Sequence, residues 1–244
     1  MTASASSHPQ DEPGLKALSA HASTPGASER SAGREAGEAD RGGPAREVVL
    51  ASNNVGKLRE FSAILDAAGI RMIAQGALGV PEADEPHVTF VENAIAKARH
   101  ASAHTGRPAL ADDSGLCVPA LGGAPGVYSA RYASMGGGEK SDQANNMRLL
   151  SHLHRVKDHR AYYVAVLVYL EGPDDPCPLV AEGRWHGELV MTARGENGFG
   201  YDPHFWLPEH GCTVAELDPA EKNRSSHRAR ALAQLLQQLR ETMA

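Results

Sequence analysis

The chain has 244 residues, of which 41% are hydrophobic, and a formal net charge of −6, which suits one domain of ordinary size with an appendage. The negative charge excludes a global field that attracts nucleic acid, and the longest apolar run, residues 162–170, is far shorter than the roughly 20 residues that cross a bilayer. Cys117, Cys177 and Cys212 show neither a disulfide framework nor zinc-site spacing, so we expect a protein of the reducing cytoplasm. From the charge and the apolar run we expect that it binds neither nucleic acid nor membrane.

Residues 1–45 differ in composition from the rest of the chain. They are rich in Ala, Ser, Gly, Glu and Arg, contain four prolines and have almost no large apolar side chains. Such a segment cannot bury enough surface to offset its chain entropy. It also lacks the apolar core of a secretory signal, and its six acidic residues argue against a transit peptide. We therefore predict a disordered extension over residues 1–45 and one folded domain over residues 46–244.

The folded domain is predicted to begin with a strand, a polar turn and a helix. Residues 48–51 form a short apolar run, and apolar residues then recur at helical spacing from Leu58 to Leu65, before Gly69. The turn between them consists of Ser52, Asn53, Asn54, Val55, Gly56 and Lys57. This arrangement presents helix N-terminal N–H groups to an anion, and Lys57 adds a positive charge. The alternative is an ordinary helix N-cap without a ligand.

A second helix is predicted from a capping box at Thr89 and Glu92 to about His104, closed by Gly106. The loop before it carries the carboxylates of Glu82, Asp84 and Glu85. Magnesium on a phosphate commonly takes one or two protein carboxylates, so one of these residues is a candidate metal ligand. The alternative is a solvated acidic loop.

The apolar residues 108–111 lead directly into Asp112, Asp113, Ser114 and Gly115. The run predicts a buried strand that delivers these polar residues to the carboxyl edge of a sheet, where open α/β sheets place their ligands. Two neighbouring carboxylates there are able to hold a divalent cation, or one holds the metal while the other activates water. The alternative is an Asx turn in which the aspartates cap backbone N–H groups.

The remaining chain alternates helices and strands and includes one hairpin, so we expect a mixed sheet. A structured loop over 119–138 precedes a helix over 142–154, and strands over 161–170 and 179–189 form an antiparallel pair. After a glycine-rich loop over 195–203, Ser225 or Ser226 caps a final amphipathic helix whose inward residues are Leu232, Leu235, Leu236 and Leu239.

Two stretches near the C-terminus are candidates for ligand contacts. The loop residues Phe199, Gly200, Tyr201 and Asp202 offer an aromatic ring that is able to stack on a base, although aromatic residues beside glycines are often part of the core. Lys222, Arg224, His227 and Arg228 crowd the predicted start of the last helix. Cations there oppose the helix macrodipole, which favours a bound polyphosphate over a solvated basic turn.

Six motifs, in this order, resemble the Ham1/RdgB family of inosine/xanthosine triphosphate pyrophosphatases over residues 47–240. They are Ser-Asn-Asn-Val-Gly-Lys at 52–57, Thr-Phe-Val-Glu-Asn-Ala at 89–94, Ala-Asp-Asp-Ser-Gly-Leu at 111–116, Gly-Gly-Ala-Pro-Gly at 122–126, Gly-Phe-Gly-Tyr-Asp-Pro at 198–203, and Glu-Lys at 221–222 with Ser-His-Arg at 226–228. The resemblance implies an α/β fold in which a long mixed sheet is flanked by helices, with a cleft between two lobes, and a homodimer. It also implies magnesium-dependent hydrolysis of ITP, dITP, XTP and dXTP to the monophosphate and pyrophosphate, which cleanses the nucleotide pool.

The resemblance further implies roles for particular residues. Asp113 is expected to accept a proton and to bind metal, Ser114 to touch the substrate, and the turn at 52–57 to hold the triphosphate with Lys97 nearby. The base and sugar–phosphate are expected to lie among residues 199–202, Lys222, His227 and Arg228. The acidic loop reads Asp84-Glu85-Pro86-His87 where the family commonly has Glu-Glu-Thr-Gly, so the second Mg²⁺ ligand is Asp84 or Glu85, with Glu85 preferred.

Two other functions remain open from the sequence. One is a Maf-like pyrophosphatase that acts on modified pyrimidine nucleotides, and the other is a nucleotide-binding module without catalysis. The second would not need Asp113.

Overall fold

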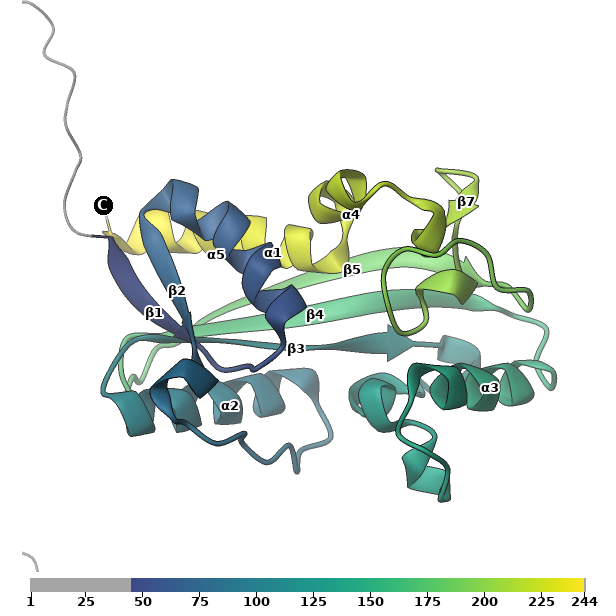
Figure 1. Cartoon of the computed structure of the whole chain (residues 1–244), viewed down its shortest axis with the longest axis horizontal. Coiled ribbons are helices and arrows are strands. Elements are labelled where there is room, and N and C mark those ends of the chain that lie inside the picture. The colour runs from purple at the N-terminus through teal and green to yellow at the C-terminus, as the bar shows by residue number, and fades with distance from the viewer. Residues whose placement is uncertain (1–44, 244) are drawn as a thin grey trace, which may run out of the picture. The chain divides into compact units, whose positions relative to one another are not determined.

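The computed structural model describes residues 45–243, which form a seven-stranded mixed sheet with the strand order β2-β1-β3-β4-β5-β6-β7 (Figure 1). β1 runs parallel to β2 and β3, and all other neighbouring pairs are antiparallel. The strands are β1 Arg46–Leu50, β2 Ile70–Ala74, β3 Ala109–Cys117, β4 Arg160–Leu170, β5 Leu179–Leu189, β6 Phe205–Leu207 and β7 Cys212–Thr213. The expected mixed sheet is therefore confirmed. The predicted disorder of residues 1–45 lies, except for Ala45, outside the described residues.

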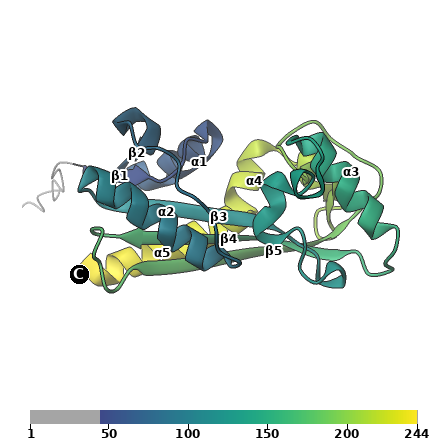
Figure 2. The same ribbon diagram turned by 90° about the horizontal axis from the view of Figure 1, so that it is seen from below.

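Helices cover both faces of the sheet: α1 and α5 lie on one face and α2 on the other (Figures 1 and 2). The helices are α1 Val55–Leu65, α2 Phe90–Thr105, α3 Asp142–Leu153, α4 Pro219–Ser225 and α5 His227–Met243. Because strand side chains alternate between faces, Leu110 packs with α1 and α5, whereas Ala109 and Ala111 pack with α2. None of the helices within residues 45–243 has the length and apolar character needed to span a membrane.

Helix α2 begins and ends as expected. The Thr89 hydroxyl accepts a hydrogen bond from the backbone N–H of Glu92 at 3.3 Å, and Gly106 ends the helix in the left-handed conformation with φ of 65°. The Glu92 carboxylate accepts from the Thr89 hydroxyl at 2.5 Å. No bond from this carboxylate to the Thr89 backbone is formed, so the Thr89 cap is present without the reciprocal half of a capping box.

The expectation that the strand at residues 108–111 ends with its apolar run is wrong, because β3 continues to Cys117. Asp112 to Gly115 lie inside β3, which pairs with β4 from Ala109 opposite Leu170 to Cys117 opposite Tyr162. This pairing satisfies the backbone groups that an Asx turn would otherwise bond, so the turn alternative is also wrong. The parallel partner β1 stops pairing at Leu50, opposite Leu110. β3 therefore carries both aspartates past the carboxyl end of β1, where a parallel strand leaves room for a ligand.

The basic cluster before the last helix is divided between two helices, which corrects the single helix start predicted above. Lys222 and Arg224 lie in the last turn of α4, where the helix dipole stabilises cations. Ser226 then caps α5, since its hydroxyl accepts from the backbone N–H of Ala229 at 3.3 Å. Only His227 and Arg228 lie at the start of α5.

Gly183 in β5 lets the first turn of α5 lie directly against the sheet. A Cβ atom at this position would overlap the carbonyl oxygen of His227 and the backbone nitrogen of Ala231. We expect Gly183→Ala to lower the free energy of unfolding by about 1–3 kcal/mol, the usual cost of overpacking, as measured by urea denaturation. Gly172→Ala is the control, because no atom lies within 4 Å of a Cβ there. Equal effects of the two substitutions would contradict this account of α5 packing.

Candidate active site

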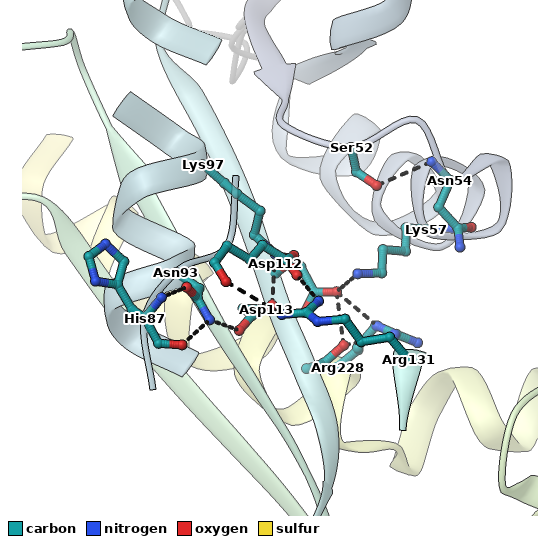
Figure 3. Close-up of polar contacts among 12 residues, drawn as sticks. Ser52, Asn54, Lys57, His87, Asn93, Lys97, Asp112, Asp113, Arg131 and Arg228 are labelled. Atoms are coloured by element: carbon teal, nitrogen blue, oxygen red, sulfur yellow. Dashed lines mark hydrogen bonds and ion pairs between the residues drawn. The ribbon is translucent and has the colours of Figure 1, made fainter. Parts of the chain in front are cut away.

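Asp112 is a fully buried carboxylate at the centre of the site (Figure 3). Its Oδ2 lies 2.7 Å from Lys57 Nζ of α1 and 3.3 Å from Arg228 Nε of α5, and it also accepts from the Ser114 hydroxyl at 3.2 Å. Burial alone would raise its pKa, but Lys57 and Arg228 together hold the pKa of Asp112 well below its ordinary value. Asp112 therefore links the first and the last helix of the folded domain through two ion pairs.

Asp113 points to the opposite face of β3, towards α2. Its Oδ1 lies 2.8 Å from Lys97 Nζ, and the Asn93 amide nitrogen lies 3.5 Å from its Oδ2. Lys97 also donates to the carbonyl oxygen of Asp112 at 2.9 Å. Burial raises the pKa of Asp113 above its ordinary value, although Lys97 lowers it in part. A carboxylate with a raised pKa and a nearby cation is suited to accepting a proton.

Glu85 of the acidic loop joins Asp113 through Lys97, whose Nζ lies 3.0 Å from Glu85 Oε1. The other oxygen of Glu85 lies 2.5 Å from Nη1 of Arg131, a residue that the sequence analysis did not single out. Asp84 lines the same cavity as Glu85, the charged cavity described below, but it takes no part in these ion pairs. Glu85 rather than Asp84 is therefore the loop carboxylate that shares Lys97 with Asp113.

The carboxylates of Asp113 and Glu85 form a donor set that fits a hard divalent cation. Both reach one ammonium group, Lys97 Nζ, so both lie within a few ångströms of a common point. Over residues 45–243, no three His, Cys, Asp or Glu side chains converge as a metal site. Two carboxylates leave the other coordination positions of such a cation to water and ligand oxygens.

Two cavities that share Lys57 and Ala130 open at this site, and they correspond to the expected cleft. The charged cavity, about 440 Å³, lies on the side of the acidic loop, and its polar lining includes Ser52, Lys57, Asp84, Glu85, Lys97, Arg131 and Lys140. The aromatic cavity, about 420 Å³, is lined among others by Asn54, Lys57, Ser114, Tyr163, Phe199, Gly200, Tyr201, Asp202, Lys222, His227 and Arg228. Lys57 therefore lies between the charged cavity and the aromatic cavity.

Asp202 organises the wall of the aromatic cavity. Its Oδ1 accepts from the Tyr163 hydroxyl at 3.0 Å, and its Oδ2 accepts from Lys222 Nζ at 2.6 Å and from the backbone N–H of Phe199 at 3.0 Å. The ring of Phe199 is half exposed, with Lys222 Nζ 4.8 Å from its centroid. The loop residue Tyr201 is buried instead, and its hydroxyl donates to the Ser129 carbonyl at 2.8 Å.

His227 is buried and stacks on Tyr163, with the ring centroids 4.9 Å apart and the planes at 15°. Burial, together with the Arg228 cation, holds the pKa of His227 well below its ordinary value of 6.5, so the ring is neutral at pH 7. Its Nδ1 is buried without a hydrogen-bond partner. His227 itself lines the aromatic cavity, so its neutral ring forms part of the wall that a ligand would meet.

The turn at 52–57 forms an ordinary N-cap and still contributes to the cavities. Asn54 caps α1 by accepting from the backbone N–H of Lys57 at 3.0 Å, and the Ser52 hydroxyl accepts from that of Asn54 at 3.2 Å. Asn53 is turned towards the acidic loop, with its amide nitrogen 3.4 Å from Glu82. The structure therefore places Ser52, Asn54 and Lys57 at the cavities, whereas Asn53, Val55 and Gly56 line neither one.

The sequence analysis missed several residues that line these cavities, namely Tyr163, Arg131, Lys140 and Asp142. Asp112 was noted as a candidate but was given no separate role. The position of Tyr163 in β4, on the sheet face that carries Asp112, is the only pattern that could have indicated its place in the site. The other three residues lie in or after the structured loop, where no periodic pattern indicates which way a side chain points.

An α/β protein that gathers lysines, an arginine and paired carboxylates beside an aromatic cavity has the features of an enzyme that acts on nucleotides. The chain belongs to the Ham1 family, whose model matches residues 48–238. It is 66% identical over 197 residues to a dITP/XTP pyrophosphatase from Bordetella pertussis, an alignment that covers 81% of this chain and 92% of the relative. It is also 66% identical over 194 residues to a dITP/XTP pyrophosphatase from Burkholderia pseudomallei, covering 80% of this chain and 93% of the relative.

Solved structures of the same family share this fold. A HAM1 protein from Coxiella burnetii matches with a TM-score of 0.76 and 48% identity, covering 80% of this chain and 99% of that chain. The Ham1 protein from Staphylococcus aureus matches with a TM-score of 0.72 and 41% identity, covering 81% and 100% of the two chains.

Proposed function

We propose that this protein hydrolyses non-standard purine nucleoside triphosphates (ITP, dITP, XTP and dXTP) to the monophosphate and pyrophosphate, and so removes them from the pool used for nucleic acid synthesis. The observation that carries the proposal is the pair of neighbouring aspartates on opposite faces of β3. Asp112 holds Lys57 and Arg228 beside the two cavities, and Asp113 lies among Lys97, Asn93 and the acidic loop. The names of the relatives, dITP/XTP pyrophosphatase, support the same substrate class.

In this proposal the triphosphate lies in the charged cavity and the base in the aromatic cavity. Lys57 and Lys97 offset the phosphate charge, and Phe199 stacks on the base. Asp113 and Glu85 would hold Mg²⁺, which when bound offsets negative charge on the phosphate oxygens. Asp113 orients a water molecule towards the α-phosphorus and accepts its proton, a role to which its raised pKa is suited.

Selectivity is proposed to come from donors aimed at the 6-oxo group of the purine. Adenine carries an amino group at that position, so it would leave such donors unpaired, which is a large cost in a buried site. Lys222, His227 and Arg228 are the candidates, because all three line the aromatic cavity. We also propose that the enzyme acts in the cytoplasm as a homodimer, as the family resemblance implies.

The test is pyrophosphate release from a panel of ITP, XTP, dITP, ATP, GTP and modified pyrimidine triphosphates, with Mg²⁺ and with excess EDTA. We expect release from ITP, dITP and XTP only with Mg²⁺, and release from ATP lower by several powers of ten if the 6-oxo donors are unpaired against adenine. Turnover of modified pyrimidines alone would favour the Maf-like alternative. Binding of ITP without pyrophosphate release would favour a nucleotide-binding module.

A further inference from the structure

Both polar groups of the Gly200 backbone are held by one helix outside the proposed catalytic centre. Asp142 Oδ2 accepts from the Gly200 N–H at 2.7 Å, and Asn146 Nδ2 donates to the Gly200 carbonyl oxygen at 2.8 Å. Asp142 and Asn146 are four residues apart in α3, so they lie on the same face of the helix. We name this pair of side chains the α3 clamp.

The loop that the clamp holds is rich in glycine. Gly195, Gly198 and Gly200 all have positive φ, which glycine adopts without strain but which glycine also leaves easily. Asn197 is tied to the segment after β7 by bonds to the carbonyl oxygens of Ala215 and Leu217. Gly200, at the tip beside Phe199, bonds instead to the two α3 side chains.

Phe199, the residue before Gly200, depends on this tip for its position. Its ring is half exposed, with Lys222 Nζ and Arg228 Cζ 4.8 and 5.6 Å from the ring centroid. Its backbone N–H donates to Asp202 Oδ2 at 3.0 Å, and its carbonyl oxygen accepts from the Asp202 N–H at 3.3 Å. Asp202 thus holds Phe199 on one side, and the α3 clamp holds the next residue, Gly200, on the other. A release of Gly200 would therefore let the ring move relative to the aromatic cavity, while β3 and its aspartates stay in place.

We propose that Asp142 and Asn146 are positioning residues, which act through Gly200 to hold Phe199 as a platform for the base. The proposal rests on the function proposed above, because it assigns the clamp to nucleotide binding at that site. Asn146 does not line the aromatic cavity, so its effect on a nucleotide has to pass through the loop. Asp142 lines the aromatic cavity, and one of its two carboxylate oxygens, Oδ2, is bonded to the Gly200 N–H.

The experiment measures kcat and KM for ITP with Mg²⁺, and Kd for ITP without metal, in a set of clamp variants. We expect Asp142→Ala and Asn146→Ala each to raise KM and Kd about fivefold, the size of one lost hydrogen bond, with kcat changed less than twofold. Asp142→Asn keeps an acceptor oxygen and should stay within twofold of the wild type. Gln143→Ala, an exposed neighbour on the same helix turn, is the control and should have no effect.

A double-mutant cycle with Phe199 separates positioning from general stabilisation. If the clamp acts through this ring, Asp142→Ala adds little to the KM of Phe199→Ala, because the platform is already gone. Independent, multiplicative effects would overturn the proposal, and so would clamp variants that lower only the melting temperature or only kcat. If the wild-type protein does not release pyrophosphate from ITP, the proposed function is rejected, and the Kd values for ITP still test the clamp. If the protein does not bind ITP, both proposals are rejected.

Discussion

Asp113→Asn is expected to lower kcat for ITP hydrolysis by about a hundredfold or more, the scale of lost general-base catalysis, without unfolding the protein. The amide cannot accept the proton of the attacking water, but it preserves the size and most contacts of the side chain. The amide oxygen is able to accept from Lys97, as Asp113 Oδ1 does at 2.8 Å, so that only the longer contact of 3.5 Å with Asn93 is lost. The measurement is steady-state pyrophosphate release, accompanied by circular dichroism and thermal unfolding of the variant.

The pH dependence adds a second check on the same residue. A general base works only when it is deprotonated, so wild-type kcat should fall on acidification as Asp113 takes up a proton. This acidic limb should be absent from the residual activity of Asp113→Asn. Asp174→Asn, which changes an exposed carboxylate in the turn between β4 and β5, is the control. Turnover near the wild-type value in Asp113→Asn would remove Asp113 from the mechanism.

Asp112→Ala is expected to destabilise the fold by about 3–5 kcal/mol, because removal of one partner leaves buried charges without compensation. Lys57 and Arg228 both lose their common counter-charge, and the link between α1 and α5 is lost with them. Urea denaturation at pH 7 measures the effect. Catalytic activity should also fall, since both cations face the cavities.

The sign of the pH effect follows from the depressed pKa of Asp112 in the folded protein. Its stabilising contribution is fully present above the unfolded-state pKa near 3.8 and is lost as the pH falls towards the lower folded-state pKa. The difference in stability between the wild type and Asp112→Ala should therefore be constant from pH 7 to about 5 and shrink below about 4. Asp158→Asn is a matched control: Arg160 lowers the pKa of that aspartate to about 2, but the pair is exposed and its loss should not be measurable. A pH-independent difference for Asp112→Ala would contradict the role of its charge.

Long, periodic segments were predictable because local rules decide them. Thr89, Gly106 and the apolar face between them defined α2, and two strand segments separated by a turn at 171–178 defined the β4–β5 hairpin. The strands β2, β6 and β7 and the helix α4 were missed, since none of them exceeds seven residues and a period needs length to be seen. They form only because neighbouring strands and helices provide partners for their backbone and apolar side chains.

Within the site, the composition of the motifs indicated which residue types would meet, but their orientation was decided by strand pairing. The extension of β3 past β1 turned two adjacent aspartates to opposite faces, so one became a buried anchor and the other lies beside the acidic loop. A sequence lists these residues as neighbours and cannot separate them until the pairing partner is known.

The sequence by itself determined the family, the order of the main helices and strands, and most of the cavity-lining residues, because helix caps, hydrophobic periods and short motifs are local properties. Only the tertiary structure decided that Lys57 and Arg228 share one carboxylate, that Tyr163 and Asp142 line the aromatic cavity, and that α3 holds the Phe199 loop. These contacts join residues far apart in the chain, and their geometry depends on how the sheet brings distant segments together, which no local pattern encodes.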